Sequence, residues 1–409
     1  IIGLQALIEA AGLKDKAIGE EQIGYVLAPR LNAAGRMGSA GRGTELLLSE
    51  DRTKADSLAM ELNEENTQRQ LLERNILALA EQQLQSIDIA RKHVLVLSGE
   101  GWHPGVIGIV ASRIVDKYYR PVVVIGIQDG KGKGSCRSIR GFHMYEALTA
   151  CHDLLTAFGG HAQAAGLSIP AANISALSDA LEQYAVQHMQ PDDFVPSVDI
   201  EAELPMEKID FQLIHELEKL APFGAGNTRP LFGCRGVRGS YARSMGAQGQ
   251  HLRFSIELPQ GEALTAIAWN MGDQVSVVNR EPVDIVFSPE INEWNNRQSL
   301  QCKLQALAPS FQQDKFPSRD VLAAIYVFLR RCRQADCSLQ GPLESMFQAY
   351  QQETTDASFY AFQTAVSVFE ELGLLRRDDA GTYFMQDAPK QKLALTESYL
   401  YRQGMHEKC

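Results

Sequence analysis

Long apolar runs are absent from this 409-residue sequence, and that absence excludes a membrane-spanning protein. No hydrophobic stretch approaches the roughly 20 residues that a helix needs to cross a bilayer. The first residues also lack the basic segment and the cleavage site of a secretory signal peptide. The hydrophobic (45%) and charged (22%) contents are ordinary for a globular protein. We therefore expect a cytoplasmic protein with no membrane association.

Paired cysteines are lacking as well. The seven cysteines are odd in number and none stands at CxxC spacing, so we expect neither a disulfide framework nor a zinc site. Reduced thiols are expected instead. The cysteines are Cys136, Cys151, Cys234, Cys302, Cys332, Cys337 and Cys409.

The sequence does not begin with methionine. Ile1 opens an apolar segment that is typical of a helix taken from a larger protein, so we expect a fragment of a longer chain. A length of 409 residues favours three or four domains over a single one.

Charge is segregated along the chain, although the formal net charge is −11. Nine Lys or Arg stand against three Asp or Glu from residue 91 to residue 143, and five arginines with no acid lie between residues 229 and 253. Residues 145–218 are instead acidic, with Lys208 as their only Lys or Arg. Such basic segments favour a protein that follows a nucleic-acid backbone. A solvated surface is the alternative explanation for either segment.

Glycine and proline are absent from residues 49–86. Leucine and isoleucine recur there near helical spacing, and Ser49-Glu50-Asp51 suits the start of a helix. A helix of this length would span roughly 55 Å, long enough to connect two lobes. A surface helix packed on one domain is the alternative.

A compact α/β pattern follows the helix. Strands are predicted at residues 94–97, 121–127 and 134–139, and helices at residues 106–115 and 145–157. A strand, a helix and a strand at this spacing indicate a βαβ unit. Ligands bind open α/β sheets where strands meet helices, and glycine-rich turns fall at those places here.

Short β patterns dominate residues 197–308, after a break at residues 191–196. Several short strands and one helix, at residues 211–220, indicate a small OB-like β-barrel. Aromatic residues that could stack on bases there are Phe232, Tyr241, Phe254, Trp269 and Trp294, although most barrel aromatics belong to the core.

The last region begins after a linker at residues 309–318. Amphipathic helices are predicted at residues 321–330 and 359–372, and a hairpin at residues 373–384. Helices followed by a hairpin resemble a winged-helix arrangement.

The segment FGGHAQAAG, residues 158–166, surrounds one titratable side chain with small residues. Glycines at a turn permit positive φ and let a ligand approach the backbone. The imidazole of His161 can donate to a phosphate oxygen or shuttle a proton. A Gly159-Gly160 loop with an incidental histidine is the alternative.

Two other clusters suit phosphate contacts. The segment APRLNAAGRM, residues 28–37, holds Arg30, Asn32 and Arg36, and guanidinium groups match phosphate oxygens in pairs. Structural ion pairs of the two arginines are the alternative.

The segment KGSCRSIR, residues 133–140, is predicted to be a strand. Ser135 and Arg137 then share one face, and Ser138 and Arg140 share the other. One face could grip a terminal or backbone phosphate.

The segment GWHPGVIGIVASR, residues 101–113, begins a helix whose first N–H groups are free. Gly105 and Gly108 permit this helix to pack closely on a neighbour. His103 is either a ligand or a capping residue, and we favour capping.

Together and in order, APRLNAAGRM, GWHPGVIGIVASRI, KGSCRS and FGGHAQAAG resemble the RecJ family of single-stranded-DNA-specific exonucleases, in the DHH phosphoesterase superfamily. GGHxxAAG resembles the signature of the DHHA1 substrate-binding domain, and LAPFGAGN (residues 220–227) resembles the entry into the RecJ OB domain. The resemblance covers residues 1–308. Residues beyond 318 resemble the variable C-terminal extension of some bacterial RecJ proteins.

The resemblance implies an α/β fold class with several parts. A DHHA1-type α/β domain (88–192) is joined by a long connector helix (49–87) to the end of a DHH domain (1–48). An OB-like β-barrel (197–308) and a mostly helical, winged-helix-like C-terminal domain (318–409) follow.

The resemblance also implies 5′-to-3′ exonuclease activity on single-stranded DNA in repair and recombination, with Mn²⁺ or Mg²⁺ activating water and stabilising the leaving oxygen. In that family, aspartates and histidines of an N-terminal DHH domain hold the metals. This sequence has no Asp-His-His, so we expect the metal ligands to precede Ile1 and the chain alone to be inactive. A single-strand-binding protein or a helicase is a candidate partner.

The site residues that the resemblance implies are one catalytic group and a nucleic-acid-binding set. They are His161, with Arg30, Asn32, Arg36, Ser135, Arg137, Ser138, Arg140, Gly159 and Gly160. Two other functions stay open: a DHH-family phosphodiesterase for small molecules or nanoRNA, and a non-catalytic single-strand-binding module.

Overall fold

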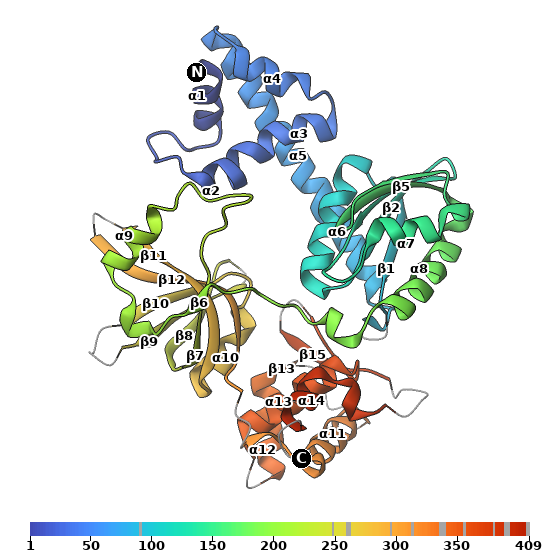
Figure 1. Cartoon of the computed structure of the whole chain (residues 1–409), viewed down its shortest axis with the longest axis vertical. Helices are drawn as coiled ribbons and strands as arrows, with labels where there is room; N and C mark the ends of the chain where they lie inside the picture. Colours follow the sequence, from blue (N-terminus) through green and yellow to red (C-terminus); the bar gives the residue numbers. More distant parts are fainter. Residues whose placement is uncertain are drawn as a thin grey trace. The chain divides into compact units, whose positions relative to one another are not determined.

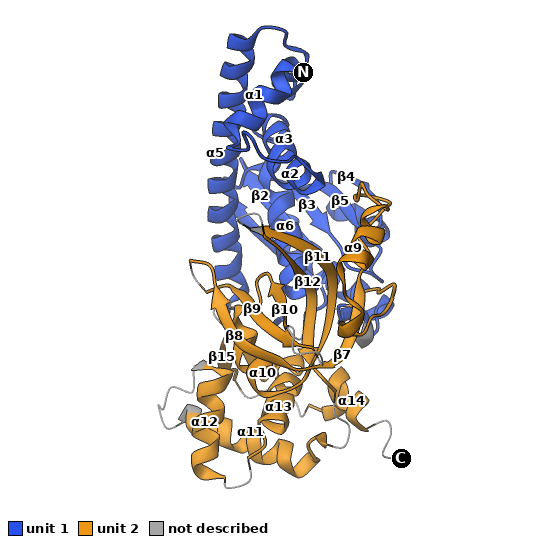
Figure 2. Ribbon diagram, turned by 90° about the vertical axis from the view of Figure 1, so that its left-hand side faces the viewer, with its two compact units in different colours: residues 1–196 blue, residues 197–409 orange. Residues whose placement is uncertain are grey.

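The structure, a computed structural model, forms two compact units, residues 1–196 and residues 197–409 (Figure 2). It describes residues 1–89, 92–247, 249–258, 263–294, 297–311, 315–334, 341–354, 357–378, 381–387 and 393–405. Arg91, Cys337 and Cys409, and the side chain of Trp294, lie outside the described residues.

Unit 1 opens with short helices that pack on the first half of one long helix (Figure 1). Leu7, Leu27, Leu46, Leu58 and Leu62 are in the buried core of this part. The helices are α1 (Ile2–Ala10), α2 (Glu20–Gln22), the π-helical turn Ile23–Leu27, α3 (Ala28–Met37), α4 (Gly41–Leu48) and α5 (Arg52–Leu84).

The predicted long helix is α5, which has 33 residues. Asp51 caps it by accepting hydrogen bonds from the backbone N–H groups of Thr53 (2.8 Å) and Lys54 (3.4 Å). Such a cap is worth about 1 kcal/mol. The second half of α5 buries Ile76 and Leu84 in a different core, beneath the sheet of unit 1. One helix therefore joins two cores.

The sheet of unit 1 has the strand order β1-β2-β3-β5-β4. β1 and β2 are parallel and are connected through α6, as the βαβ pattern predicted, and the other neighbours are antiparallel. α5 and α6 cover one face, and α7 and α8 cover the other. The elements are β1 (Leu95–Glu100), α6 (Pro104–Tyr118), β2 (Val122–Gln128), β3 (Lys131–Arg137), α7 (Met144–Ala150), β4 (Ala157–Gly160), β5 (Ala164–Pro170) and α8 (Ile174–His188).

The helix predicted at residues 145–157 is wrong beyond Ala150. A short 3₁₀ turn at His152–Leu154 follows α7, and Ala157 already belongs to β4. The backbone N–H of Thr156 donates to the carbonyl of Ser168 on β5, 2.9 Å away, so sheet pairing begins there.

Unit 2 contains a seven-stranded sheet in the order β6-β7-β11-β12-β10-β9-β8. Its predicted helix is α9 (Phe211–Glu218), and α10 (Val275–Arg280) is a second one. The strands are β6 (Ala202–Glu203), β7 (Phe232–Val237), β8 (Gly239–Met245), β9 (His251–Glu257), β10 (Ala263–Ala268), β11 (Val283–Trp294) and β12 (Arg297–Pro309).

The structure corrects one part of the predicted OB-like β-barrel, which is that the described strands do not close into a barrel. Within the described residues the edge strands β6 and β8 do not pair, so the sheet remains open. α10 packs against β8 instead, and a Cβ atom on Gly239 would lie 2.3 Å from the Val278 side chain. Helix side chains, rather than strand pairing, cover this edge.

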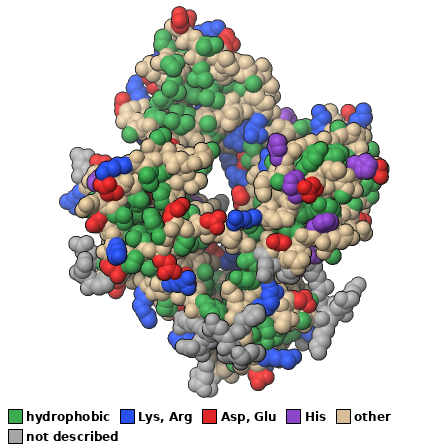
Figure 3. All heavy atoms as spheres, viewed as in Figure 1, with side chains coloured by type: hydrophobic (Ala, Val, Ile, Leu, Met, Phe, Trp, Pro, Cys, Tyr) green, Lys and Arg blue, Asp and Glu red, His purple; other side chains and the backbone are tan. Residues whose placement is uncertain are grey.

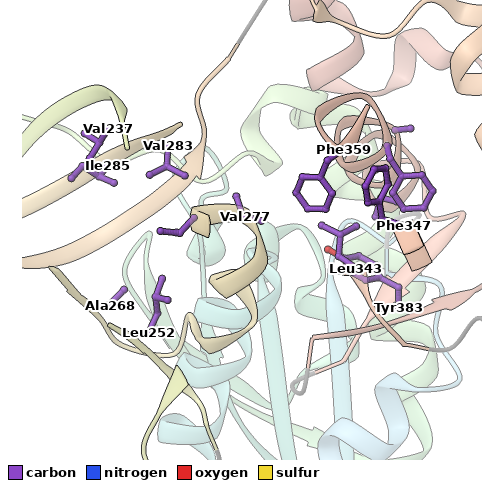
Figure 4. Packing of buried hydrophobic residues seen from close by; sticks show 14 of the residues in the cluster. Val237, Leu252, Ala268, Val277, Val283, Ile285, Leu343, Phe347, Phe359 and Tyr383 are labelled. Atoms are coloured by element: carbon purple, nitrogen blue, oxygen red, sulfur yellow. The ribbon is translucent and has the colours of Figure 1, made fainter. Parts of the chain in front are cut away.

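The C-terminal region shares a hydrophobic core with the sheet of unit 2 (Figure 4). The sheet side is mostly aliphatic and includes Leu252 and Ile285, whereas the helical side contributes Phe347 and Phe359. The elements are α11 (Arg319–Gln334), β13 (Gly341–Pro342), α12 (Leu343–Glu353), α13 (Phe359–Glu371), β14 (Leu375–Arg377), β15 (Thr382–Met385) and α14 (Tyr399–Met405).

The hairpin predicted in this region is the antiparallel pair β14 and β15, with β13 added beside β15. Across the described residues of both units, we find no helix with the length and apolar character needed to cross a membrane.

Candidate nucleic-acid interface

In the sheet of unit 1, one serine and two glycines of the predicted motifs lie side by side on three neighbouring strands. Ser135 on β3 pairs with Gly166 on β5, and Gly166 pairs with Gly159 on β4. Directly opposed residues of antiparallel strands point to the same face. This face therefore carries one hydroxyl and two positions without a side chain.

The same face is open beyond α6. Along β4 and β5, Ala157, Gly159 and Gly166 are exposed, whereas Ala165 and Leu167 are buried against the other face. Towards β1 and β2 the α6 face is covered, because Leu97 and Val124 pack under α6. A flat surface of small residues thus lies beside the covered part of the sheet.

Arg137 lies on this face next to Ser135. Its Nη1 donates to the Ser135 hydroxyl (3.2 Å) and to the carbonyl of Cys136 (2.8 Å). A Cβ atom on Gly108 of α6 would lie 2.9 Å from the Ser135 hydroxyl oxygen and 3.2 Å from Arg137 Nη2. Glycine at position 108 therefore leaves room for these two polar groups under the helix.

His161 lies in the turn between β4 and β5. Its backbone N–H donates to the carbonyl of Ala164 (2.8 Å), and Ala164 pairs with Arg137 across the sheet. Gly160 has φ 147°, and a Cβ atom there would lie 2.5 Å from the Ala164 carbonyl, so the turn requires glycine. The imidazole is exposed, and no hydrogen bond of its side chain is found within the described part of the chain.

The start of α6 touches the end of α3. Arg36 Nη1 donates to the carbonyl of Gly105 (3.1 Å), and a Cβ atom on Gly105 would lie 2.2 Å from the carbonyl oxygen of Arg36. His103 caps α6, because its Nδ1 accepts from the backbone N–H of Gly105 (3.1 Å). The capping role favoured from the sequence is confirmed.

A hollow of about 620 Å³ lies between α3, α5 and α6. It contains Asn32 and Arg36, which the sequence singled out, together with basic residues of α5 and α6 that it did not. Figure 3 shows Lys and Arg side chains gathered between the N-terminal helices and the α/β sheet of unit 1. The lining residues are Tyr25, Pro29, Asn32, Arg36, Arg69, Gln70, Glu73, Arg74, Ile109 and Arg113.

Other predicted residues lie elsewhere. Arg30 ties α3 to α5: its Nε donates to Asn63 Oδ1 (3.0 Å) and its Nη1 to the carbonyl of Val26 (2.7 Å). Partial burial lowers the pKa of Arg30. Ser138 is buried and donates to the carbonyl of Phe142 (2.7 Å), while Arg140 is exposed just after β3.

The basic segment from residue 91 to residue 143 does not form one continuous track. Lys117 pairs with Glu81, 2.7 Å apart. Arg120 donates to the carbonyl of Lys92 (2.9 Å), and burial lowers its pKa to about 10. Lys131 and Lys133 are exposed on β3. Only part of the charge that the sequence counted can therefore face a phosphate backbone.

In unit 2, Arg243 on β8 and Arg253 on β9 are directly opposed, and both are exposed. Like charges in that position repel each other, and an anion between them relieves the repulsion. Of the aromatic residues predicted to stack on bases, Tyr241 and Trp269 are exposed. Phe232 is partly buried, and Phe254 belongs to the hydrophobic core.

Two family descriptions match the chain. The DHHA1 domain matches residues 91–187, and the RecJ OB domain matches residues 200–306. The chain is homologous to RecJ and carries its DHHA1 and OB domains. The predicted resemblance is confirmed, and the fold is mixed α/β with these two domains and a helical C-terminal region.

Curated RecJ relatives are similar over about three quarters of this chain. The single-stranded-DNA-specific exonuclease RecJ of Bacillus subtilis is 36% identical over 314 residues, 76% of this chain and 39% of the relative. RecJ of Thermus thermophilus is 37% identical over 294 residues, covering 72% and 40%. RecJ of Escherichia coli is 32% identical over 319 residues, covering 75% and 54%. The chain thus spans about two fifths to a little over half the length of these relatives.

Solved RecJ structures have the same fold. Crystal structures of Thermus thermophilus RecJ with Mg²⁺ and with Mn²⁺ match with TM-scores of 0.64 and 0.65 at 31% identity. They cover 80% of this chain, which covers 50% and 48% of theirs. Where this chain is described, no three His, Cys, Asp or Glu side chains are grouped to hold a metal ion. The described residues thus do not fit such an ion.

Proposed function

We propose that this chain is the strand-binding portion of a RecJ-type exonuclease that degrades single-stranded DNA from the 5′ end during repair and recombination. The observation that carries this proposal is the open face of the unit 1 sheet. It places Ser135 and Arg137 beside Gly159, Gly166 and the turn of His161. Homology to single-stranded-DNA-specific exonucleases supports it.

Each group on this face has a chemical role in the proposal. Arg137 and Ser135 bind one phosphate, because a guanidinium and a hydroxyl supply several directed donors. Gly159 and Gly166 let the backbone of the strand lie flat on the sheet. His161 donates to a phosphate oxygen or moves a proton at the reacting end. Gly160 holds the turn that presents it.

Mn²⁺ or Mg²⁺ is the cofactor of the proposed enzyme and would supply the activated water. We propose that its ligands lie outside the described residues, because those residues have no suitable cluster. A cytoplasmic location and a partner such as a single-strand-binding protein or a helicase belong to the proposal. So does a winged-helix-like role for the C-terminal helices and hairpin.

Binding measurements test the strand-binding role. We expect the chain to bind a labelled single-stranded oligonucleotide more tightly than the matching duplex, and Arg137→Ala to weaken binding about tenfold, as expected for a charge-assisted phosphate contact. The control is Arg52→Ala, since Arg52 is exposed and already paired with Glu9 and Asp56. Equal affinity for the duplex, or an Arg137→Ala variant that binds like the wild type, would contradict the proposal.

Catalysis is tested in the full-length enzyme. His161→Ala is expected to slow single-turnover cleavage by about 10²–10³-fold, the usual cost of losing a preorganised contact in an active site. Its thermal unfolding should stay unchanged, because the side chain is exposed. Normal cleavage by this variant would contradict a catalytic role for His161. The chain would then be a strand-binding module without catalytic groups.

A further inference from the structure

We infer that the C-terminal region positions Trp269 of the OB domain for stacking on a base, through the hairpin of β14 and β15, which we call the wing. This inference rests on the proposed function, since the base belongs to the same single strand. Trp269 directly follows β10 and has an exposed side chain. The C-terminal region thus acts in strand binding without touching the DNA.

The helix that would read DNA in a winged-helix protein is buried here. The C-terminal region has the helices α11, α12 and α13 and a three-stranded sheet in the order β13-β15-β14. In a helix-turn-helix the second helix enters the major groove, and α13 has that place in the pair α12 and α13. Nine of its 13 residues are buried, among them Phe362, Gln363 and Val366. A helix enclosed in this way cannot present side chains to base edges, so the region has another role.

The wing contacts the turn that follows Trp269. This turn is a short 3₁₀ helix, Gly272–Gln274. Arg377 on β14 donates from Nη1 to Asp273 Oδ2 at 2.5 Å. A Cβ atom on Gly381, at the start of β15, would lie 2.6 Å from the Asp273 Cβ, so the wing backbone lies directly against Asp273. An ion pair and close packing therefore both hold Asp273.

The wing is itself fixed by hydrogen bonds. Asp378 Oδ1 accepts from the backbone N–H of Thr382 (2.8 Å), and the carbonyl of Asp378 accepts from the N–H of Gly381 (3.0 Å). Gly381 has φ 78°, which the tight turn requires. Glu370 on α13 lies 3.8 Å from Arg377 Nε, so a second carboxylate holds this guanidinium. The wing thus offers Asp273 a partner whose place is set by the rest of the C-terminal region.

A short and tied segment connects Asp273 to Trp269. The backbone N–H of Asn270 donates to His251 Nδ1 on β9 (3.1 Å), and the N–H of Gly272 donates to a backbone carbonyl just before β9 (3.1 Å). The rings of His251 and Trp269 meet edge to face, with centroids 4.5 Å apart. With only three residues between them, a shift of Asp273 displaces the backbone that carries the indole.

A second contact holds the far end of the same segment. The 3₁₀ turn continues into α10, which ends at Arg280, and this guanidinium pairs with Glu344 on α12. The guanidinium also lies over two rings, 5.4 Å from the centroid of Phe347 and 4.8 Å from that of Phe359. Between the two ends, Val277 belongs to the core shared with these rings (Figure 4). The C-terminal region therefore holds both ends of the segment that follows Trp269.

A double-mutant cycle on strand affinity tests this positioning role, with a labelled oligothymidylate and the 409-residue chain in fluorescence anisotropy. Trp269→Ala is expected to weaken binding about fivefold or more, by the loss of one stacked base. Gly381→Ala places a Cβ against Asp273 and should weaken binding by part of that factor. The double variant should bind like Trp269→Ala alone, because the position of Trp269 matters only while its ring is present.

Gly236→Ala is the matched control. Gly236 on β7 has φ 65°, and a Cβ atom there would meet open space among the described residues. This variant carries a similar backbone strain without the clash, and it should bind like the wild type. Thermal unfolding of the same samples shows which variants are folded. If Gly381→Ala does not fold, Asp273→Asn takes its place in the cycle, because it removes the charge that Arg377 pairs with.

The outcomes separate this inference from the proposed function. If the wing variant binds like Gly236→Ala, or if its loss adds in full to that of Trp269→Ala, the wing does not act through Trp269 and the inference is overturned. If Trp269→Ala binds like the wild type while Arg137→Ala does not, the inference also falls and the proposed function stands. A wild-type chain that does not bind the oligothymidylate overturns both.

Discussion

The guanidinium of Arg36 donates to the carbonyl of Gly105, while the carbonyl oxygen of Arg36 occupies the place that a Cβ atom on Gly105 would need. These two interactions hold the end of α3 against the start of α6. The candidate interface extends over both helices, so its geometry depends on a position without a side chain.

Gly105→Ala is expected to push α3 away from α6. The added Cβ would lie 2.2 Å from a backbone oxygen, and overpacking of this kind costs about 1–3 kcal/mol. Thermal unfolding should shift down by about 2–4 °C per kcal/mol, and strand affinity should fall as well. The matched control is Gly35→Ala on α3, where a Cβ meets only an ordinary contact at 3.5 Å. A Gly105→Ala melting temperature at or above that of Gly35→Ala would be inconsistent with this reasoning.

The two glycines of the GGH motif should respond differently to alanine. Gly160→Ala should lower stability, because φ is 147° and the Cβ would lie 2.5 Å from the Ala164 carbonyl. Gly159→Ala has open space around it and should unfold like the wild type, yet bind the strand less tightly because the methyl group stands on the open face. Differential scanning fluorimetry and anisotropy on the same samples check both. Unchanged affinity of Gly159→Ala would count against a strand lying on this face.

Glu73→Gln should destabilise unit 1 strongly. Removing one charge of a buried ion pair typically costs about 3–5 kcal/mol, and here it leaves Arg69 buried without its carboxylate. Glu81→Gln breaks the more exposed pair with Lys117 and should cost about 0–1 kcal/mol. Urea unfolding of the two variants gives the comparison. Equal midpoints would show that the buried network contributes nothing to the fold.

Arg243→Ser should relieve a repulsion and weaken DNA binding together. The opposed pair Arg243 and Arg253 carries like charges at one cross-strand position, so removing one of them should leave stability unchanged or slightly raised. Each phosphate of a single strand that a protein neutralises contributes about −0.7 to the slope of log affinity against log salt concentration. If both arginines neutralise phosphates, the variant should therefore show a shallower slope, by about 0.7 for each phosphate contact that it loses. A salt titration measures the slope, and an unchanged slope would place the DNA elsewhere.

Stability of the C-terminal region should fall as pH rises above the ordinary range of a glutamate. Burial raises the pKa of Glu370, although Arg377 Nε at 3.8 Å opposes the shift, and Asp273 and Glu371 add to it. A carboxyl with a raised folded-state pKa stabilises the fold below its unfolded value, and that stability is lost as pH rises through the raised value. Thermal unfolding from about pH 4, near the ordinary pKa of a glutamate, upward should show this loss.

Glu370→Gln should flatten that pH profile and raise the melting temperature at neutral pH. Glu353→Gln serves as the control, because Glu353 is exposed and pairs with Arg331 at the surface. A Glu370→Gln profile that follows the wild type at every pH would mean that another group titrates.

Helices and hairpins were predicted correctly where a single feature of a short sequence segment indicated them. The absence of Gly and Pro predicted α5, and the two short segments at residues 373–377 and 382–384 predicted the hairpin of β14 and β15. The place of His103 beside the free N–H groups at the start of a helix predicted its capping role. Each of these depends on interactions within a few residues.

Long-range packing accounts for what the sequence did not predict. In the open sheet of unit 2, α10 packs against the edge strand β8, a contact that no short window of the sequence encodes. The helix α12 went unnoticed, although Leu343, Met346, Phe347 and Tyr350 have helical spacing. The pattern that predicts a long connecting helix does not by itself identify Arg69 and Glu73 as buried. The signal was present, since charged residues occupied positions that the leucine spacing assigns to the buried side.

The unbroken α5 also sets the rotation and the distance between the two parts of unit 1 that it joins. One residue inserted between Leu62 and Asn66 would rotate everything that follows by about 100° and advance it by about 1.5 Å. Arg69 and Arg113 would then turn away from Arg36, although every local interaction of the sheet could survive. Seven inserted residues would nearly restore the rotation but open a gap of about 10.5 Å. A change in the length of α5 therefore preserves the interface only if it keeps both the rotation and the distance between the two parts of unit 1.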